Sequence, residues 1–394
     1  MLEILINRNQ EGREIALVEN GRLIEYYIDE EKTTRKEGNI YVGVVKDIIK
    51  GMQAAFVDIG TEKNSFIHLK DILNKVDETK GQEQQTEEIN KVLKKGQKLL
   101  VQVKKDSNLQ KGARVSTHIN LPSKYIALMP NTEIITVSQK IEDKKEQERL
   151  IKLVKENIGK GNGAIIRTSA EGKEQEIIKD IKNVERKWQK IKKSYNEYKE
   201  NNPILIEKSQ SIVEKMIIDL PENSIDKIIV NSQKDYKKIQ EFKNQNNYFS
   251  NTVLELKENS NVFEKYNLKN EIGKIENRKI WLNCGGFITI DKTEALTAID
   301  VNTGKYTGNQ NLEQTIFKVN QEATIEIAKQ LRLRDIGGII IIDYIDMKDK
   351  SNKEKIEELL KEKLRNDRAK TQVEGFTKLD LMEMTRKHIC SHKE

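Results

Sequence analysis

The stretch from residue 285 to residue 347 constrains the fold most, because it reads as a strand, a helix and a second strand. Its first part, GGFITIDKTEALTAIDVNTG, alternates apolar and polar residues and predicts a β-hairpin whose second strand ends at Asp300. Apolar residues then recur at steps of three and four from Leu312 to Leu331, which predicts one face of a helix. The run GGIIIIDYIDM follows, and its four isoleucines predict a strand that is buried on both faces and ends at Asp343. A helical crossover joins parallel strands of one sheet, so we expect Asp300 and Asp343 at the same sheet edge.

Two carboxylates at one sheet edge repel each other unless a cation lies between them. Neighbouring strands lie about 4.8 Å apart, which lets the side chains of Asp300 and Asp343 meet at one divalent ion. Mg²⁺ binds one or two carboxylates and leaves positions for a phosphate substrate, so we expect phosphodiester hydrolysis by a metal-activated water. Asn302 could hydrogen-bond a phosphate oxygen, and Asp346 could orient the water or the hydration shell of the metal. The alternative is that these aspartates only cap the elements that follow them.

Short strands recur between residues 38 and 120 and suggest a small closed barrel of the OB type. In AAFVDIGTEKNSFIHL, Phe56 and Phe66 fall on adjacent strands of this barrel. Exposed rings there can stack on RNA bases, whereas core packing is the commoner role of phenylalanine. The polar piece from residue 77 to residue 95 is expected to be the longest loop of the barrel.

The remaining segments predict further hairpins and helices around the barrel. Asn20 and Gly21 indicate a two-residue turn between strands within residues 2–28. Helices are expected near residues 142–157, 173–199 and 211–221, and a strand at 225–232, while residues 244–278 are polar and stay unassigned. Arg167 and Thr168 end an apolar strand, where a guanidinium fork and a hydroxyl suit a terminal phosphate. A surface ion pair is the alternative role for that arginine. The basic helix KNVERKWQKIKK could attract a polyanion, or its charges could form a solvated face.

Composition excludes several classes of protein. A length of 394 residues indicates more than one domain, and 70 Lys and Arg against 63 Asp and Glu give a charge of +7 that suits a polyanionic partner. Two distant cysteines indicate no disulfide framework and a reducing compartment. The start does not resemble a signal peptide and no run approaches about 18 apolar residues, so we expect no membrane segment and a cytoplasmic protein. The 4 histidines form no paired acid–base motif, so we do not expect phosphodiester cleavage by histidine through a cyclic phosphate.

Three long motifs resemble the ribonuclease E/G family of bacterial single-strand endoribonucleases: TEALTAIDVNTGKYTG, ATIEIAKQLRLRDIGGIIIIDYIDM and FTKLDLMEMTRK. The resemblance runs from the N-terminal hairpin to about residue 387. It implies an enzyme that uses Mg²⁺, with Mn²⁺ as a substitute, to cut single-stranded A/U-rich RNA into products with 5′-phosphate and 3′-hydroxyl ends. It also implies stimulation by a 5′-monophosphate and a role in rRNA and tRNA processing and mRNA turnover.

The resemblance assigns roles to single residues of the catalytic part. Asp300 and Asp343 fall on the two metal-ligating aspartates of the family, and Asn302 falls on the asparagine that supports the scissile phosphate. Asp346 matches the second acid of the family's D-[FY]-I-D-M run and is a further candidate catalytic residue.

The resemblance also assigns RNA-binding residues outside the catalytic part. The RNA contacts of the barrel fall on Phe56, Phe66 and Lys111. The contacts to the 5′-phosphate fall on Arg167 and Thr168.

The fold that the resemblance implies is α/β and β multidomain. An RNase H-like subdomain receives an inserted OB-fold S1 domain and a 5′ sensor, and a DNase I-like α/β catalytic subdomain follows. The expected boundaries are 1–36 and 213–275 for the RNase H-like subdomain, 37–120 for the S1 domain, 121–212 for the 5′ sensor and 276–394 for the catalytic subdomain.

The sequence departs from the family at two places. Ser123 and Ala127 stand where relatives carry Gly and Val around the 5′-phosphate pocket. Relatives continue into a C-P-x-C zinc link and a small dimerising domain, whereas RKHICSHKE holds one cysteine, Cys390, and the spacing of His388 and His392 matches no zinc site, so we expect no Zn²⁺.

These departures leave two matters open. The first is the oligomeric state, for which a homo-oligomer is possible. The second is the function, for which the alternative is an RNA-binding protein of the same family with weak or no cleavage. The absence of a recognisable scaffold tail for other enzymes favours the shorter, ribonuclease G-like branch.

Overall fold

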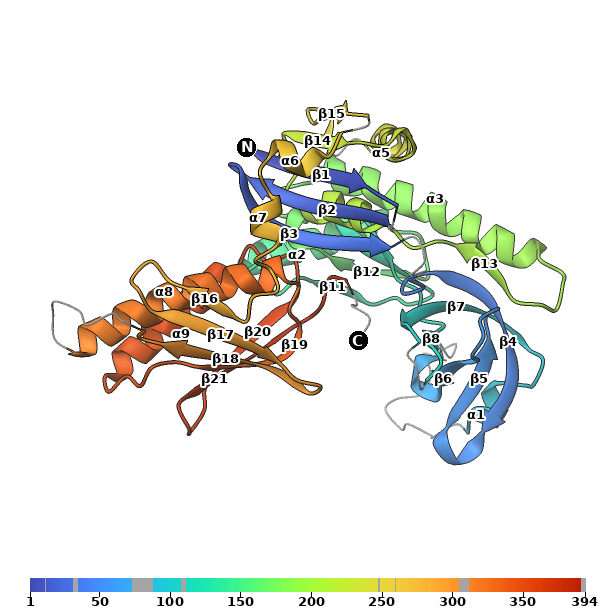
Figure 1. The fold of residues 1–394 in the computed structure, drawn as a ribbon. Coiled ribbons are helices and arrows are strands. Elements are labelled where there is room, and N and C mark those ends of the chain that lie inside the picture. Colours follow the sequence, from blue (N-terminus) through green and yellow to red (C-terminus); the bar gives the residue numbers. More distant parts are fainter. Residues whose placement is uncertain are drawn as a thin grey trace. The chain divides into compact units, whose positions relative to one another are not determined.

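The computed structural model of the chain falls into two compact units, Met1–Thr33 with Asp219–Glu394, and Thr34–Ile218 (Figure 1). Each unit contains its own hydrophobic core. The structure describes residues 1–10, 12–30, 35–72, 88–107, 111–246, 249–258, 260–304 and 312–390.

The first sheet of the larger unit has the strand order β15-β14-β1-β2-β3. Its strands are β1 (Leu2–Arg8), β2 (Gly12–Glu19), β3 (Arg22–Glu30), β14 (Lys227–Val230) and β15 (Val253–Leu256). The first three strands are antiparallel, whereas β14 runs parallel to β1 and β15 runs parallel to β14. The predicted turn between β2 and β3 is confirmed, because Asn20 and Gly21 have φ angles of 50° and 78°.

Helices complete this part of the larger unit. They are α5 (Gln233–Gln245), α6 (Val262–Lys265) and α7 (Lys269–Ile272). Helix α4 (Ile212–Asp219) belongs to the smaller unit except for its last residue. Val262 and Phe263 of α6 pack with Leu5 of β1 in the core of the sheet. The region that stayed unassigned from sequence therefore contains β15, α6 and α7.

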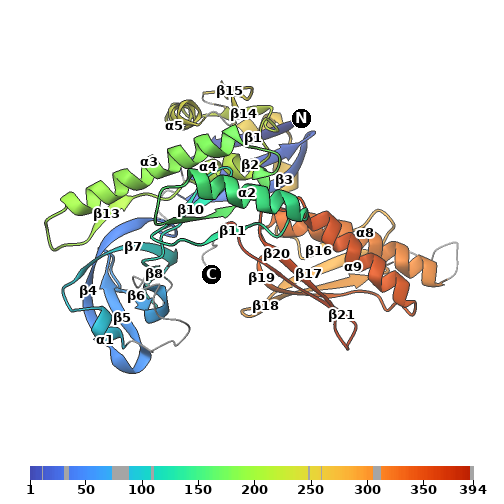
Figure 2. The same ribbon diagram turned by 180° about the vertical axis from the view of Figure 1, so that it is seen from behind.

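The second sheet of the larger unit has the order β16-β17-β18-β19-β21-β20. Its strands are β16 (Lys279–Trp281), β17 (Phe287–Lys292), β18 (Leu296–Asn302), β19 (Gly338–Asp343), β20 (Thr371–Phe376) and β21 (Leu381–Arg386). Two helices, α8 (Leu312–Leu333) and α9 (Lys350–Leu364), cover one face of it, as Figures 1 and 2 show from opposite sides. The predicted hairpin, crossover helix and parallel strand are all confirmed.

The expectation that β19 is buried on both faces is wrong. Ile340 and Ile342 are fully buried under the helices, but Ile339 on the other face is 51% exposed and Ile341 is half-buried. Helices α8 and α9 pack on the same face, so only alternate side chains of β19 enter the core. The isoleucine run reflects the preference of β-branched residues for strands rather than burial on two faces.

The smaller unit contains the predicted OB-type barrel. Its strands are β4 (Ile40–Ile49), β5 (Ala54–Asp58), β6 (Ser65–His68), β7 (Lys98–Lys105) and β8 (Arg114–Ser116). Pairing of β4 with β7 closes the barrel, and β13 (Ile204–Glu207) extends the sheet beside β4. Most of the loop expected at residues 77–95 lies outside the described residues, and its described end contains α1 (Ile89–Val92).

A four-stranded sheet of order β11-β12-β10-β9 follows the barrel in the smaller unit. Its strands are β9 (Leu121–Pro122), β10 (Ile126–Pro130), β11 (Ile135–Val137) and β12 (Asn162–Ile166). The predicted helices near it are confirmed as α2 (Lys144–Asn157) and α3 (Gln175–Glu197). No helix in the described part of the chain has the length and apolarity needed to cross a membrane.

Candidate active site

Asp300 and Asp343 lie side by side at the ends of two neighbouring strands. The parallel register of β18 and β19 pairs Asp300 directly with Asp343, as the sequence pattern predicts. Both side chains are exposed, on the face of the sheet opposite α8 and α9. The two carboxylates therefore meet on a surface that a substrate can reach.

Hydrogen bonding and charge link the neighbouring polar residues to this pair. The Asn302 amide donates from Nδ2 to Oδ2 of Asp300 over 2.5 Å. Partial burial raises the pKa of Asp343 above its ordinary value, and the negative charges of Asp300 and Asp346 raise it further. The structure thus brings the four predicted catalytic residues together, with Asn302 bonded to Asp300 and with Asp300 and Asp346 close enough to Asp343 to repel its charge.

This donor set fits Mg²⁺ better than a metal that needs a complete protein cage. No group of three or more His, Cys, Asp or Glu side chains among the described residues is arranged to hold an ion. Mg²⁺ requires only one or two carboxylates because it retains waters in its remaining positions. Asp300 and Asp343 could supply those two carboxylates, and a cation between them would offset the charge repulsion that, after burial, raises the pKa of Asp343.

Helix α8 anchors the loop that carries Asp346 through residues that sequence reasoning missed. The fully buried Asn320 donates from Nδ2 to the Ile345 carbonyl over 2.8 Å, and its Oδ1 accepts from the Ile345 amide over 3.1 Å. Thr324, one turn later, shares a 2.9 Å hydrogen bond with the Tyr344 hydroxyl. Their signal in the sequence is two polar residues at a spacing of four within the apolar stripe of the helix.

The turn beside Asn302 is also attached to α8. Glu322 accepts hydrogen bonds from the backbone amides of Asn283 and Cys284. Gly304 has a φ of +61°, and a Cβ at this position would lie 2.4 Å from the carbonyl oxygen of Gly285. The turn after β18 therefore requires glycine, and α8 holds the segments on both sides of the strand pair.

Comparison with known proteins places this geometry in a family. The Ribonuclease E/G family profile matches residues 120–389. The chain belongs to the ribonuclease E/G family. The S1 RNA binding domain profile matches residues 34–117, which contain the barrel. Both the expected family and the expected S1 domain are therefore confirmed.

Individual members of the ribonuclease E/G family align with almost the whole chain. Ribonuclease G of Salmonella typhimurium (strain SL1344) is 39% identical over 396 residues, which cover 98% of this chain and 79% of that protein. Ribonuclease G of Haemophilus influenzae is 38% identical over 391 residues, with the same two shares. Ribonuclease E of Escherichia coli (strain K12) is 33% identical over 398 residues, covering 99% of this chain but 37% of that protein. These values agree with the expectation of a ribonuclease G-like chain.

In the S1 domain, Phe56 and Phe66 form a cross-strand pair on the outside of the barrel. They are register partners on β5 and β6, and their ring centroids lie 6.2 Å apart at an interplanar angle of 71°. Phe56 is 36% exposed, and neither ring belongs to the barrel core. Lys111 is exposed and precedes β8, whose Arg114 is the register partner of Phe66. The three predicted RNA-binding residues therefore lie on neighbouring elements of the barrel.

The predicted 5′-phosphate residues lie at the end of β12. Arg167 donates from Nη1 to the carbonyl of Ser123 over 2.8 Å, and the hydroxyls of Thr168 and Ser138 are 2.9 Å apart. Ala127 is buried in β10. A residue that sequence reasoning missed, Asp180 of α3, organises this corner.

Asp180 is only 1% exposed and accepts a 2.5 Å hydrogen bond from the Ser123 hydroxyl. It also accepts from the backbone amide of Tyr125 over 2.9 Å. Ser123, where the resemblance leads us to expect glycine, therefore makes a hydrogen bond that glycine could not make, in the segment whose carbonyl accepts from Arg167.

The described part of the C-terminal segment folds back on Asp335. His388 places Nδ1 2.8 Å from the Asp335 carbonyl, and the Cys390 amide donates to Oδ2 of Asp335 over 2.7 Å. Asp335 also pairs with the buried Arg386 at 2.8 Å. His392 lies outside the described residues, so the expectation about zinc stays a prediction.

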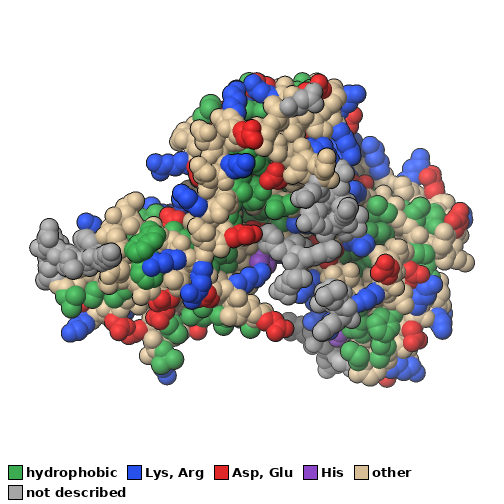
Figure 3. Space-filling view, viewed as in Figure 1, with side chains coloured by type: hydrophobic (Ala, Val, Ile, Leu, Met, Phe, Trp, Pro, Cys, Tyr) green, Lys and Arg blue, Asp and Glu red, His purple; other side chains and the backbone are tan. Residues whose placement is uncertain are grey.

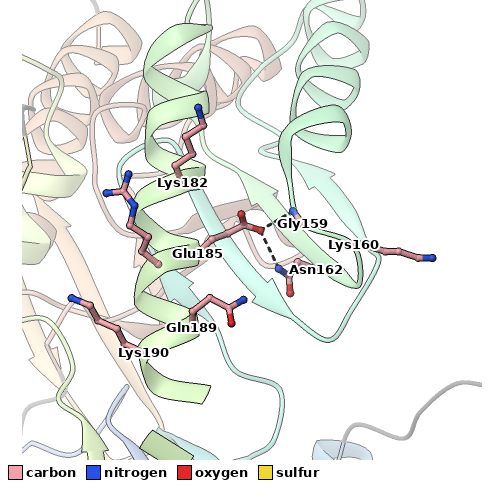
Figure 4. Close-up of a pocket in the computed structure, with 8 residues that line it drawn as sticks. Gly159, Lys160, Asn162, Lys182, Glu185, Gln189 and Lys190 are labelled. Carbon is pink, nitrogen blue, oxygen red and sulfur yellow. Dashed lines mark hydrogen bonds between the residues drawn. The ribbon is translucent and has the colours of Figure 1, made fainter. Parts of the chain in front are cut away.

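A shallow pocket of about 600 Å³ lies beside α3 in the smaller unit (Figure 4). Glu185 is at its centre and accepts hydrogen bonds from the Gly159 amide over 2.7 Å and from Asn162 Nδ2 over 3.1 Å. Basic side chains extend away from Glu185 around the rim, so a polyanion would meet positive charge there. These basic residues are Lys160, Lys182, Arg186 and Lys190.

Proposed function

We propose that this chain is a Mg²⁺-dependent endoribonuclease that cuts single-stranded A/U-rich RNA and leaves 5′-phosphate and 3′-hydroxyl ends. The observation that carries the proposal is the register pairing of Asp300 with Asp343 inside the region matched by the family. The names of the aligned relatives, ribonuclease G and ribonuclease E, support the same reaction class.

The catalytic residues would divide the work of adding water across one phosphodiester bond. Asp300 and Asp343 would hold Mg²⁺, and bound Mg²⁺ activates water and stabilises charge on the phosphate. Asn302 uses one of its two amide hydrogens on Asp300, so the second can donate to a phosphate oxygen. Asp346 would orient the attacking water, whose oxygen joins the phosphorus while the 3′-oxygen leaves with a proton.

The smaller unit would bind the RNA that the larger unit cuts. Phe56 and Phe66 would stack on bases, and Lys111 would pair with a phosphate. Arg167 and Thr168 would bind a terminal 5′-monophosphate, which would stimulate cleavage. The expected substrates are precursors of rRNA and tRNA together with mRNA, processed in the cytoplasm.

The subdomain assignment belongs to the same proposal. Three antiparallel strands followed by two parallel ones support an RNase H-like origin for the first sheet. The second sheet, with α8 and α9 on one face, would be the DNase I-like catalytic subdomain. The boundaries expected from the sequence, the 5′-sensor assignment and a homo-oligomer remain predictions.

The test is cleavage of a fluorescent, 5′-monophosphorylated A/U-rich oligonucleotide with Mg²⁺, Mn²⁺ or EDTA. We expect Asp300→Asn and Asp343→Asn to lower kcat/KM at least about 100-fold, as losses of preorganised electrostatic groups do. Asp291→Asn is the matched control, because Asp291 lies on the adjacent strand β17 and pairs with Arg278. Equal cleavage in EDTA, or undiminished cleavage by both aspartate variants, would refute the metal mechanism.

The second candidate is an RNA-binding protein with weak or no cleavage. The S1 match fits this candidate as well as it fits the endoribonuclease. It predicts that wild-type protein binds the oligonucleotide in Mg²⁺ without cutting it. Phe56→Ala combined with Phe66→Ala should then reduce binding while the cleavage rate stays at background. Products with 3′-hydroxyl ends that form only with divalent metal would exclude this candidate.

A further inference from the structure

An aromatic cluster with a lysine lies on the open face of the second sheet. Trp281 on β16 is 59% exposed, and its ring meets Phe287 of β17 edge to face, with centroids 5.3 Å apart at 62°. The Lys279 ammonium lies 4.1 Å from the Trp281 centroid and 3.5 Å from the Phe287 centroid. We call Lys279, Trp281 and Phe287 the aromatic cluster.

Strand register connects the aromatic cluster to the candidate active site. Trp281 pairs with Phe287, and Phe287 pairs with Asn302, so these three residues form one row across β16, β17 and β18. Two strand spacings separate the backbones of Trp281 and Asn302, which is about 10 Å. Asp300 lies two residues before Asn302 on the same face, beside Asp343. A nucleotide on the aromatic cluster would therefore lie next to a phosphate held at the two aspartates.

Packing against the core explains why the residues on either side of Trp281 are apolar, but it does not explain the tryptophan itself. Ile280 and Leu282 point toward the core under α8, whereas Trp281 points to the open face. Figure 3 shows hydrophobic side chains mixed with basic and acidic ones over this part of the larger unit. One explanation for the exposed ring is the cation–π contact with Lys279. A second explanation is ligand binding, because a large exposed aromatic side chain beside a polar site is common at binding sites.

We propose that the aromatic cluster is a base-stacking subsite for a nucleotide that neighbours the scissile phosphate. This inference rests on the proposed function, because the ligand is the same single-stranded RNA. Every base has a π face, so stacking on Trp281 would hold an unpaired base without selecting its identity. The Lys279 ammonium would pair with the phosphate of that nucleotide. The stacked base would thereby align the next phosphate with Asp300 and Asp343.

Tryptophan fluorescence tests the stacking directly. The chain has two tryptophans, and Trp188 of α3 is only 5% exposed, so Trp188→Phe leaves Trp281 as the single reporter. In the Asp343→Asn background, a short A/U-rich oligonucleotide is bound without being cut, and fluorescence anisotropy of a labelled copy measures binding. We expect RNA to quench Trp281 and to protect it from acrylamide. Bound RNA with no quenching and no protection would overturn the proposal.

Steady-state kinetics separate this subsite from a structural role. Stacking of one base on an aromatic ring strengthens binding by roughly 5- to 150-fold. Trp281→Ala should therefore raise KM by about that factor with a much smaller change in kcat. Trp281→Phe should restore most of the loss. Ile339→Ala is the control, because Ile339 is 51% exposed on the same sheet and is the register partner of Leu296, away from the aspartates. Equal KM values for the alanine variants at both positions would refute the subsite.

The two readouts distinguish this inference from the proposed function. Quenching of Trp281 by RNA in a Trp188→Phe chain that keeps both aspartates but does not cleave would refute the endoribonuclease and support the subsite. Metal-dependent cleavage with an unquenched Trp281 would support the endoribonuclease and refute the subsite.

Discussion

The buried carboxylate of Glu25 provides a quantitative test of how the larger unit holds together. Glu25 of β3 has no exposed surface and accepts hydrogen bonds from Arg368 Nη2 at 2.6 Å and from Arg332 Nη2 at 3.0 Å. Arg332 belongs to α8, and Arg368 follows α9. The Tyr27 hydroxyl donates to the same carboxylate over 2.9 Å. One carboxylate thus joins the first sheet to α8 and to the segment that follows α9.

The magnitude follows from the pKa of Glu25. Burial alone would raise that pKa, but the charges and hydrogen bonds of Arg368 and Arg332 outweigh burial and lower it from an ordinary value of 4.5 to about 2. One pKa unit corresponds to about 1.4 kcal/mol, so ionised Glu25 is linked to about 3 kcal/mol of folding free energy. Because the folded pKa lies below the unfolded one, this stability is present above pH 4.5 and is lost as the pH falls toward 2.

Glu25→Gln removes the negative charge and leaves Arg368 buried without its main partner. Breaking one side of a buried ion pair typically costs about 3 to 5 kcal/mol. We therefore expect the free energy of unfolding of Glu25→Gln to be about 3 kcal/mol below that of the parent protein at pH 7 and the difference to shrink below pH 4. Urea unfolding followed by Trp281 fluorescence in a Trp188→Phe background monitors the larger unit.

The matched control is Glu146→Gln in the smaller unit, whose unfolding is followed by the fluorescence of the buried Trp188 in a Trp281→Phe background. Glu146 also accepts two hydrogen bonds from one arginine, Arg149, both 2.7 Å long, but this pair lies at the surface. Its loss should cost less than about 1 kcal/mol because solvent screens exposed pairs. If Glu25→Gln were no more costly than Glu146→Gln, or if its cost did not change between pH 7 and pH 3, the role assigned to the buried network would be wrong.

Three further predictions concern the candidate sites. Asn320→Ala should lower kcat roughly 10- to 100-fold and raise the Mg²⁺ concentration for half-maximal activity, because the loop after Asp343 loses both hydrogen bonds to Asn320. An unchanged Mg²⁺ dependence would contradict this role. Arg167→Ala should narrow the ratio of cleavage rates for 5′-monophosphate and 5′-hydroxyl substrates toward one, and an unchanged ratio would count against the 5′ sensor. Substituting Lys182, Arg186 and Lys190 together by Gln should reduce the salt dependence of RNA binding by a slope of roughly 2 if all three contact phosphates. If the slope of the binding constant against salt concentration equals that of the parent protein, these residues do not contact RNA phosphates and form a solvated face.

Features that depend on short-range pattern could be predicted from the sequence. The Asn20–Gly21 turn, the apolar stripe of α8 and the strand that ends at Asp343 each lie within one continuous segment. The parallel pairing of β18 and β19 also followed, because a helical crossover leaves few other topologies. Family resemblance, not pattern alone, connected these strands to RNA cleavage.

Features that depend on contacts between distant segments could not be predicted. Asn320 meets Ile345, and Asp180 meets Ser123, across 25 and 57 residues of sequence. The aromatic cluster appears only when the register of β16 with β17 is known. Periodicity identifies which residues share a face of an element, but it does not reveal what lies opposite that face.

The one-sided packing of β19 and the chemistry of the site have the same structural cause. A second layer of helices over the open face would bury Asp300 and Asp343. Removing an unpaired carboxylate from water costs roughly several kcal/mol. Leaving that face open keeps both acids exposed and reachable, but it also exposes apolar side chains such as Ile339 and Trp281. Because Trp281 lies in the row that leads to Asn302, a nucleobase is a ligand that can cover the exposed ring without burying the carboxylates. Under the proposed function, the same open face would therefore carry both the metal ligands and a contact for the substrate.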